Sequence, residues 1–441
     1  MTRSEPVSTL LRSRPEAALA RIAGGVMLVV VAAALVVPRG AMNYLAILTL
    51  VVGALAVQRG WRLRDARWPT PAARGLLVLG GVAVASSLWA VAPVEAWKLG
   101  ALFLLNVLLT VVACDLLWQE KGVRLARLGL GLVIGLLLGL TFQLEEILSR
   151  LWLHKLLYNT FPSQIPGNTD DYNVANGVVV SVASFMLNRQ VAVAAMLLWP
   201  TLLVVSGVRD TAWRRTLWLG ILALSCAVIL LSQHESSKLA LVCSLAAFAG
   251  AALSYRWSGR VVLAVWLIAT LLIVPIAASM FHAKLYEQTW IQTSGRARII
   301  MWGYTATLVA KAPVLGIGAG SAAVLDAKAD HTNLPGQPWG LYTAGHQHNI
   351  YLQTWYELGL LGALVLCVTG VLGWRRIGTL PGGVRCYALA TFVSVAGLCA
   401  TSYGIWQPWL CASLGLAAVA LSIAMRHAET SAFDLLREGV D

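Results

Sequence analysis

The apolar residues of this chain fall into long continuous runs, and short polar segments separate one run from the next. A helix needs about 20 apolar residues to cross the roughly 30 Å hydrocarbon core of a bilayer, and most of the runs approach that length. The runs lie near residues 22–38, 41–58, 73–92, 97–118, 125–144, 190–207, 213–231, 237–254, 261–281, 348–372, 385–402 and 406–425. They predict an all-α polytopic membrane protein with about twelve transmembrane helices, and they lack the alternation typical of a membrane β-barrel.

The composition agrees with this interpretation. Of the 441 residues, 58% are hydrophobic and only 12% are charged, whereas a soluble domain carries about 25% charged residues. So few charges cannot cover a surface that faces water on all sides. The formal net charge of +13 is typical of some nucleic-acid-binding proteins, but the basic residues lie in the loops between apolar runs. We therefore expect membrane lipids, and no nucleic acid, as partners.

The basic residues are distributed unevenly over the loops. Most of the 33 Lys and Arg residues lie near the two ends of the chain and in alternate loops such as 59–74 and 209–215. Loops rich in Lys and Arg stay in the cytoplasm, so both termini are expected on the cytoplasmic side. The first run is followed by Val37-Pro38-Arg39 and not by small residues, which indicates a retained span rather than a cleaved signal peptide.

The opposite side of the membrane collects polar segments and most of the histidines. We divide the chain into residues 1–281, with nine spans and an outer segment 145–189; an outer loop 282–347; and residues 348–441, with three spans and a cytoplasmic tail. Residues 172–187 are apolar but too short to cross, so they are expected to form a helix on the outer surface. Six of the seven histidines fall on this outer side, which predicts that a functional site faces outward.

The outer loop contains a short basic helix. A helix is expected over residues 295–311, with Ser294 as its N-cap and Pro313 beyond its end. Arg296 and Arg298 then lie in the first turn, where they oppose the helix dipole unless an anion is bound. A helix N-terminus with added arginines suits a diphosphate. The alternative is a surface helix whose arginines are solvated or reach lipid headgroups. Trp302 follows Arg298 by four residues and shares its face.

His346 and His348 stand where the chain re-enters the membrane. Two residues at this spacing point apart on a helix, so they are a poor metal pair. A single histidine at this position can act as a general base near neutral pH, but the spacing does not select one, and a capping or interface histidine is the alternative. Glu357 lies well inside the next span, where a carboxylate is costly and is either functional or paired with a neighbour.

Three other features carry weaker signals. Lys238 opens a span and either snorkels to the headgroups or holds phosphate. Asp170 and Asp171 form an acidic pair in a loop, which is a weak indication of a metal site, and we expect no metal. The run from Leu315 to Gly320 has the glycines of a dinucleotide fingerprint but lacks its βαβ context, so we interpret it as a flexible turn.

Taken together, these motifs resemble the O-antigen ligase and polymerase superfamily, which also includes bacterial protein O-oligosaccharyltransferases. The resemblance covers residues 230–375. It rests on the span layout and on two runs: Ser294-Gly295-Arg296-Ala297-Arg298 with Trp302 and Pro313-Val314-Leu315-Gly316-Ile317-Gly318, and His348-Asn349 with Leu352, Glu357-Leu358-Gly359 and Gly362. It implies a GT-C-like glycosyltransferase fold with a large periplasmic loop between the ninth and tenth helices.

The resemblance also implies roles for individual residues. His348 is similar to the base that deprotonates the acceptor hydroxyl, and Arg298, with Arg296 as the alternative, is similar to the ligand of the donor diphosphate. Lys238 stands where family members usually have arginine. A lysine keeps the positive charge there but lacks the bidentate fork of a guanidinium. Arg189 also resembles a family position. The remaining candidates support the site without a direct role: His346, Asn349, Trp302 and Glu357.

The function implied is that of an O-antigen ligase in the bacterial inner membrane. Such an enzyme transfers an undecaprenyl-diphosphate-linked polysaccharide to the lipid A–core oligosaccharide at the periplasmic face, with inversion and without metal or cofactor. The alternatives within the superfamily are an O-antigen polymerase and a protein O-oligosaccharyltransferase. The alternative from another class is a transporter or flippase of lipid-linked sugars, but we find no internal repeat of the kind many transporters show.

Overall fold

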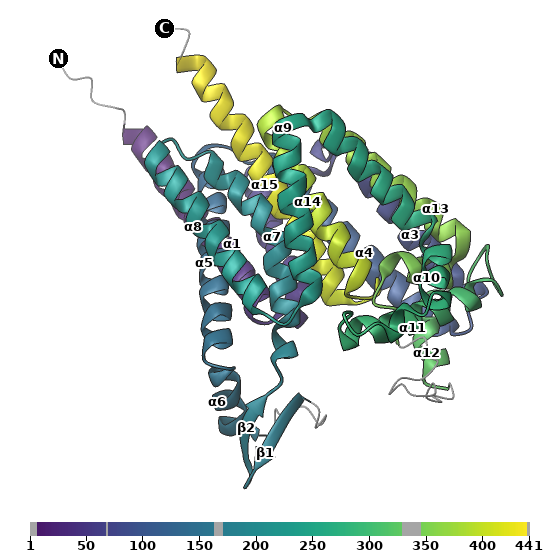
Figure 1. Ribbon diagram of the computed structural model, residues 1–441. Helices are drawn as coiled ribbons and strands as arrows, with labels where there is room; N and C mark the ends of the chain where they lie inside the picture. The colour runs from purple at the N-terminus through teal and green to yellow at the C-terminus, as the bar shows by residue number, and fades with distance from the viewer. Residues whose placement is uncertain (1–6, 68, 163–170, 329–344, 439–441) are drawn as a thin grey trace. The chain divides into compact units, whose positions relative to one another are not determined.

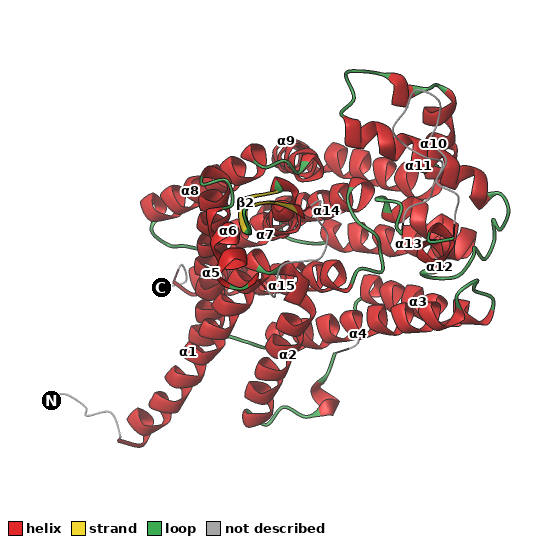
Figure 2. Ribbon diagram, turned by 90° about the horizontal axis from the view of Figure 1, so that it is seen from below, coloured by secondary structure: helices red, strands yellow, loops and turns green. Residues whose placement is uncertain are grey.

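The computed structural model describes residues 7–67, 69–162, 171–328 and 345–438. Helices make up most of this part of the chain, as Figure 2 shows. Eleven helices among the described residues are long and apolar enough to cross a membrane. The expected all-α polytopic membrane fold is therefore confirmed.

Figure 1 shows the elements along the chain and labels most of them. The helices are α1 (Val7–Val36), α2 (Ala41–Gln58), α3 (Pro71–Ala85), α4 (Pro93–Trp118), α5 (Gly122–Leu148), α6 (Trp152–Thr160), α7 (Asn188–Ser206), α8 (Thr211–Leu231), α9 (Glu235–Leu271), α10 (Ile273–His282), α11 (Thr293–Val309), α12 (Ser321–Asp326), α13 (Ile350–Gly378), α14 (Gly382–Thr401) and α15 (Pro408–Glu438). Short 3-10 turns lie at Pro38–Gly40, Leu63–Asp65, Ser86–Leu88, Ser184–Leu187 and Leu285–Glu287. Two strands, β1 (Tyr172–Ala175) and β2 (Val178–Val182), form an antiparallel hairpin.

The described chain forms two compact units. The first contains Met1–Arg67, Val112–Val242 and Ala412–Asp441, and the second contains Trp68–Val111 and Cys243–Cys411. Both units are therefore built from segments that are distant in sequence, and each is described by itself below.

Glycines let two helices of the first unit pack closely. Gly131, Gly135 and Gly139 recur every fourth residue along the face of α5 that meets α1. A Cβ added at Gly131 would lie 2.2 Å from the carbonyl oxygen of Gly24, and one added at Gly135 would lie 2.7 Å from that of Leu28. Spaced small residues of this kind permit close helix contact in membranes. Helix α7 packs against α5 and α8 and is almost entirely buried.

The hairpin replaces the helix that the sequence analysis expects over residues 172–187. Asn176 and Gly177 have φ values of 52° and 76°, which is the conformation that a two-residue hairpin turn requires and that Asn-Gly favours. The β-branched valines of β2 favour a strand. The Asn159 side chain of α6 binds the backbone of Val179 in β2 with two hydrogen bonds. Its Oδ1 accepts from the Val179 N–H at 2.7 Å, and its Nδ2 donates to the Val179 carbonyl at 3.1 Å. Only Ser184–Leu187 is helical, as a 3-10 turn.

The difference between eleven observed and twelve expected spans arises at residues 237–281. We expected a break between the eighth span, 237–254, and the ninth, 261–281, and α9 does consist of two helices that meet at a kink at Ser254, where φ is −158° and ψ is 98°. The two helices follow each other without a loop, so they count as one apolar helix. Two contacts stabilise the backbone just after Ser254. The Arg385 guanidinium lies 4.6 Å from the Tyr255 ring centroid, and the Trp374 Nε1 donates to the Gly259 carbonyl at 2.8 Å. The remainder of the expected ninth span forms the shorter helix α10.

In the second unit, α13 is broken at Gly359, where φ is 60° and ψ is −159°. The break frees backbone groups that the loop after α11 satisfies, as polar backbone inside a membrane requires. The hydrogen bonds run from Leu360 N to Pro313 O, from Leu361 N to Val314 O, from Ile317 N to Tyr356 O and from Gly318 N to Glu357 O, with lengths of 2.8 to 3.2 Å. A Cβ at Gly359 would lie 2.4 Å from the Val314 carbonyl carbon, so only glycine fits.

The same loop contacts the turn that precedes α4. The Val91 N–H donates to the Ile317 carbonyl at 2.9 Å, and the Ala319 N–H donates to the Ser86 Oγ at 3.0 Å. The run from 315 to 320 is therefore a turn, as expected, but its backbone is bonded on two sides and is not free.

Candidate active site

Helix α11 carries the two candidate arginines of the second unit, Arg296 and Arg298. It covers Thr293–Val309, close to the expected 295–311. The expected N-cap is wrong, because the helix begins before Ser294 and its N-cap residue is Gln292, with no side-chain hydrogen bond to the first turn. Because α11 begins at Thr293, Arg296 is its fourth residue and Arg298 its sixth, so Arg298 lies in the second turn and not in the first as expected. Both arginines are half-buried.

The guanidinium of Arg298 lies in a partly desolvated position. Burial lowers its pKa, and Tyr403 opposes this shift. Among the described residues, no carboxylate forms an ion pair with Arg298. A desolvated cation is costly unless an anion compensates it, so this position is suited to an anionic ligand group.

His348 is held in one orientation by the backbone. Its Nδ1 lies 2.6 Å from the Ser402 carbonyl oxygen. Because a carbonyl oxygen only accepts, Nδ1 carries the proton and Nε2 of the neutral ring has the free lone pair. The residue has a φ of 49°, which is uncommon for a residue with a side chain. The tautomer is the one that a general base acting through Nε2 needs.

The electrostatic surroundings keep the His348 ring neutral. Burial, His346 and Arg298, in that order, lower its pKa to about 3, and the hydrogen bond to Ser402 opposes the shift. The rings of His346 and His348 meet edge to face with their centroids 4.2 Å apart. The expected Arg298–His348 pair is therefore brought together closely enough for the arginine charge to act on the imidazole.

Trp302 joins α11 to the histidine segment. Its Nε1 donates to the Gln347 carbonyl at 2.6 Å, and Gln347 is fully buried. Because Arg298 and Trp302 share one face of α11, this bond brings the backbone between the two histidines to the arginine face.

Asn349, which follows His348 in the chain, caps the helix that begins there. It is the N-cap of α13, and its Oδ1 accepts from the Leu352 N–H at 3.0 Å. A cap of this kind satisfies a free N–H group of the first helical turn. The base candidate therefore lies directly before a capped helix start.

Glu357 is fully buried and binds neutral donors instead of a cation. Its carboxylate accepts from the N–H groups of Gly320 and Ala322 at 3.1 and 3.3 Å, and from the Gln353 Nε2 at 3.3 Å. The Trp406 Nε1 also donates to it. Of the two interpretations considered for this residue, the geometry favours pairing with neighbours, since it ties α12 and the segment after α14 to α13.

The segment after α14 supplies site residues that the sequence analysis missed. Ser402 contacts His348, Trp406 contacts Glu357, and the N–H of Ile405 donates to the Gln353 Oε1 at 3.0 Å. A Cβ at Gly404 would lie 2.7 Å from the His346 Cβ. The backbone groups leave no sequence signal, but the aromatic Trp406 at the start of the last run could have indicated a contact.

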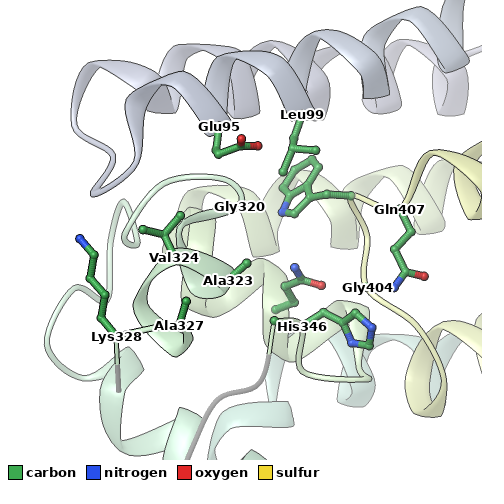
Figure 3. A pocket seen from close by; sticks show the side chains of 13 residues that line it. Glu95, Leu99, Gly320, Ala323, Val324, Ala327, Lys328, His346, Gly404 and Gln407 are labelled. Carbon is green, nitrogen blue, oxygen red and sulfur yellow. The ribbon is translucent and has the colours of Figure 1, made fainter. Parts of the chain in front are cut away.

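A pocket of about 500 Å³ lies beside this segment (Figure 3). Glu95 and Leu99 of α4 face it from one side, and His346 and Gln407 lie across from them. Ala323 lines it from α12. Its other polar lining groups are Lys328, Gln353 and Trp406. Arg298 and His348 are not among the lining residues.

The remaining candidates belong to the first unit. Lys238 is half-buried, and its Nζ lies 2.8 Å from the Glu235 carboxylate. Arg189 is the second residue of α7 and is also half-buried. Their roles stay predictions. Asp170 and His331 fall outside the described residues, and within the described ranges no three His, Cys, Asp or Glu side chains gather as a metal site.

The fold is that of an all-α, multi-pass membrane protein, and its second unit brings the Arg298 charge to act on His348. Its residues 219–367 match the family model of the O-antigen ligases. This match confirms the family resemblance inferred from the sequence.

Three rickettsial proteins named "putative polysaccharide ligase" are similar to parts of the chain. The protein of Rickettsia conorii is 25% identical over 242 residues, which cover 52% of this chain and 55% of that protein. The one of Rickettsia felis is 25% identical over 151 residues, covering 33% and 37%. The one of Rickettsia prowazekii is 27% identical over 145 residues, covering 31% and 35%. The chain thus spans about half the length of the first relative and less of the others.

Proposed function

We propose that this protein is an O-antigen ligase, which transfers a polysaccharide from undecaprenyl diphosphate to the lipid A–core oligosaccharide. The family match and the similarity to the rickettsial proteins support a glycosyl-transfer role of the ligase or polymerase type. The observation that carries the proposal is the hydrogen bond from His348 Nδ1 to Ser402, because it leaves Nε2 as a base.

The proposed reaction is a single displacement. His348 Nε2 takes the proton of the acceptor hydroxyl while the hydroxyl oxygen attacks the anomeric carbon of the donor sugar. The bond between that carbon and the diphosphate oxygen breaks, and its electron pair leaves with the lipid diphosphate. Arg298 stabilises the charge on this leaving group, and the imidazolium later returns its proton to water. Attack opposite the leaving group inverts the anomeric configuration.

The low pKa of His348 fits a base that donor binding activates. Without the donor, burial disfavours the imidazolium most, followed by His346 and the Arg298 cation. A diphosphate bound at Arg298 would place negative charge beside the ring and raise its pKa toward the range in which a base works best. The proton transfer would then occur only when the donor is in place.

The proposal assigns the charge of the leaving group to fixed cations instead of a metal. Arg296 is the alternative ligand on α11, and Lys238 and Arg189 are further candidates. The site would face the periplasm, with the inner membrane carrying the protein and both termini in the cytoplasm. A donor and an acceptor that are both anchored in the membrane would reach such a site without leaving the bilayer.

The experiment that tests the function compares acceptors. The purified protein in lipid nanodiscs receives an undecaprenyl-diphosphate glycan together with rough lipopolysaccharide, with a glycan repeat unit on its lipid carrier, or with a pilin-like protein. Transfer to rough lipopolysaccharide supports the ligase. Transfer only to repeat units or only to protein replaces it by the polymerase or the protein O-oligosaccharyltransferase. Movement of the lipid-linked glycan across the bilayer without any glycosyl product replaces it by the transporter.

A further inference from the structure

The pocket between α4, α12 and the segment after α14 lies apart from the Arg298 guanidinium but beside the histidines. We infer that it binds a terminal sugar ring of the acceptor glycan, an inference that rests on the proposed function and names where its second substrate is held. Its volume of about 500 Å³ is within the range of small-molecule pockets, roughly 300–1,000 Å³.

The lining has the composition that a sugar ring needs. Small residues form part of the wall, including Gly320, Ala323 and Gly404, and leave room for a ring. Residues with polar side chains line the pocket from separate elements: Glu95, Lys328, His346 and Gln407. Gln353 also lines it, but its amide is already bonded to Glu357 and to the Ile405 N–H. Apolar walls with a few placed hydrogen-bonding groups fix the orientation of a small ligand. Carboxylate, amide and ammonium groups together can donate to and accept from the hydroxyls around a sugar ring.

The charge of the lining selects among sugars. Glu95 brings a carboxylate, whose Oε1 lies 3.3 Å from the Nζ of Lys98, and Lys328 brings an ammonium group, so one negative and one positive charge stand among the lining residues. Such a lining favours an uncharged sugar over a phosphorylated one, since a phosphate would meet a single lysine and a carboxylate. The donor diphosphate belongs at Arg298, which does not line the pocket.

The pocket and the base share one backbone segment. Residues 402–407 supply the carbonyl that orients His348, the glycine that packs on His346, and Gln407 and Trp406 in the pocket wall. His346 lines the pocket and meets His348 edge to face. A sugar held in the pocket therefore lies on the histidine side of the site, where an acceptor hydroxyl must be to reach the base. The donor sugar, which carries the diphosphate, would lie on the arginine side.

Filling the pocket tests this assignment. Ala323 is exposed and lines the pocket, so Ala323→Phe fills space without removing a hydrogen-bonding side chain. Ala310→Phe, at the exposed C-cap of α11 and outside the pocket lining, is the matched control. The pocket variant is expected to raise the KM for the acceptor by about tenfold or more while kcat and the KM for the donor change by less than about twofold, as loss of substrate binding predicts. The control variant is expected to change none of the three. An unchanged acceptor KM in Ala323→Phe, or a rise in the donor KM instead, overturns the assignment.

Direct binding separates this inference from the proposed function. The lipid-free core oligosaccharide is titrated into the full-length His348→Ala protein in nanodiscs, and binding is followed by ligand-observed NMR. Saturable binding that Ala323→Phe abolishes and Ala310→Phe retains supports the pocket, even if no transfer reaction is found. Binding that is equal in both variants overturns it, even if transfer to the core proceeds. Glu95→Gln, which keeps the size of the side chain, is expected to weaken binding severalfold and serves if Ala323→Phe does not fold.

Discussion

The Nδ1 atom of His348 donates to the carbonyl oxygen of Ser402 at 2.6 Å, across 54 residues of sequence. This bond determines which nitrogen of the ring is free, and the Asn349 cap determines where the ring lies at the start of α13. The Arg298 charge acts on the same ring from α11. Three segments of the second unit thus converge on one imidazole.

The first prediction concerns the base. His348→Ala is expected to lower the transfer rate by about 10²- to 10⁴-fold, the typical contribution of a general base, while the Kd of the donor changes little. The measurement is single-turnover transfer, with donor binding determined in parallel. Loss of donor binding in this variant, or retention of most of the rate, would show that His348 has another role.

The second prediction concerns the arginine. Arg298→Ala is expected to raise the Kd of the donor by about tenfold or more, because a charged hydrogen bond contributes roughly 1.5–3 kcal/mol. Arg298→Lys keeps the positive charge but loses the bidentate guanidinium, so its Kd for the donor should lie between that of the unchanged protein and that of Arg298→Ala. Titration of the donor into the protein in nanodiscs measures all three. An unchanged Kd in both variants would assign the diphosphate to Arg296 or to the cations of the first unit.

The third prediction concerns pH. His348 must be neutral to accept a proton, and in the free protein its pKa of about 3 keeps it neutral above that value. Donor binding is expected to raise the pKa, so protonation then begins at a higher pH. Because kcat/KM reports the free enzyme and kcat the bound complex, the acidic fall of kcat should lie at higher pH than that of kcat/KM. Coincident acidic limbs would mean that the donor does not change the ionisation of the base.

The fourth prediction concerns the broken helix. Gly359→Ala is expected to destabilise the protein by roughly 1–3 kcal/mol or more, because φ of 60° is strained for alanine and the added Cβ meets the Val314 backbone. Gly25→Ala is the matched control, since no atom lies within 4 Å of its added Cβ. Thermal unfolding in detergent compares the two. A Gly359→Ala protein as stable as the control would contradict the account of the α13 break.

The sequence predicted the parts of this structure that depend on local pattern. Hydropathy identified the spans, and four-residue spacing placed Arg298 and Trp302 on one face of α11. The hairpin was missed because its valines were counted as apolar length, although Asn176-Gly177 is a strong turn signal. The contact between His348 and Ser402 could not be predicted, since a backbone carbonyl carries no side-chain signature. The hydrogen bonds between residues 313–318 and the break of α13 at Gly359 could not be predicted either, since they too join backbone groups.

The most direct test of the central claim is the pKa of His348 itself, measured by NMR of the ¹⁵N-histidine-labelled protein with and without a non-transferable undecaprenyl diphosphate analogue. The ring faces His346 and Arg298, so His346→Gln provides the background without the second imidazole. The account predicts a pKa well below 6.5 in the free protein and a clear rise when the analogue binds, with the rise much reduced in Arg298→Ala. A pKa that stays the same on binding would contradict the proposed coupling of donor and base.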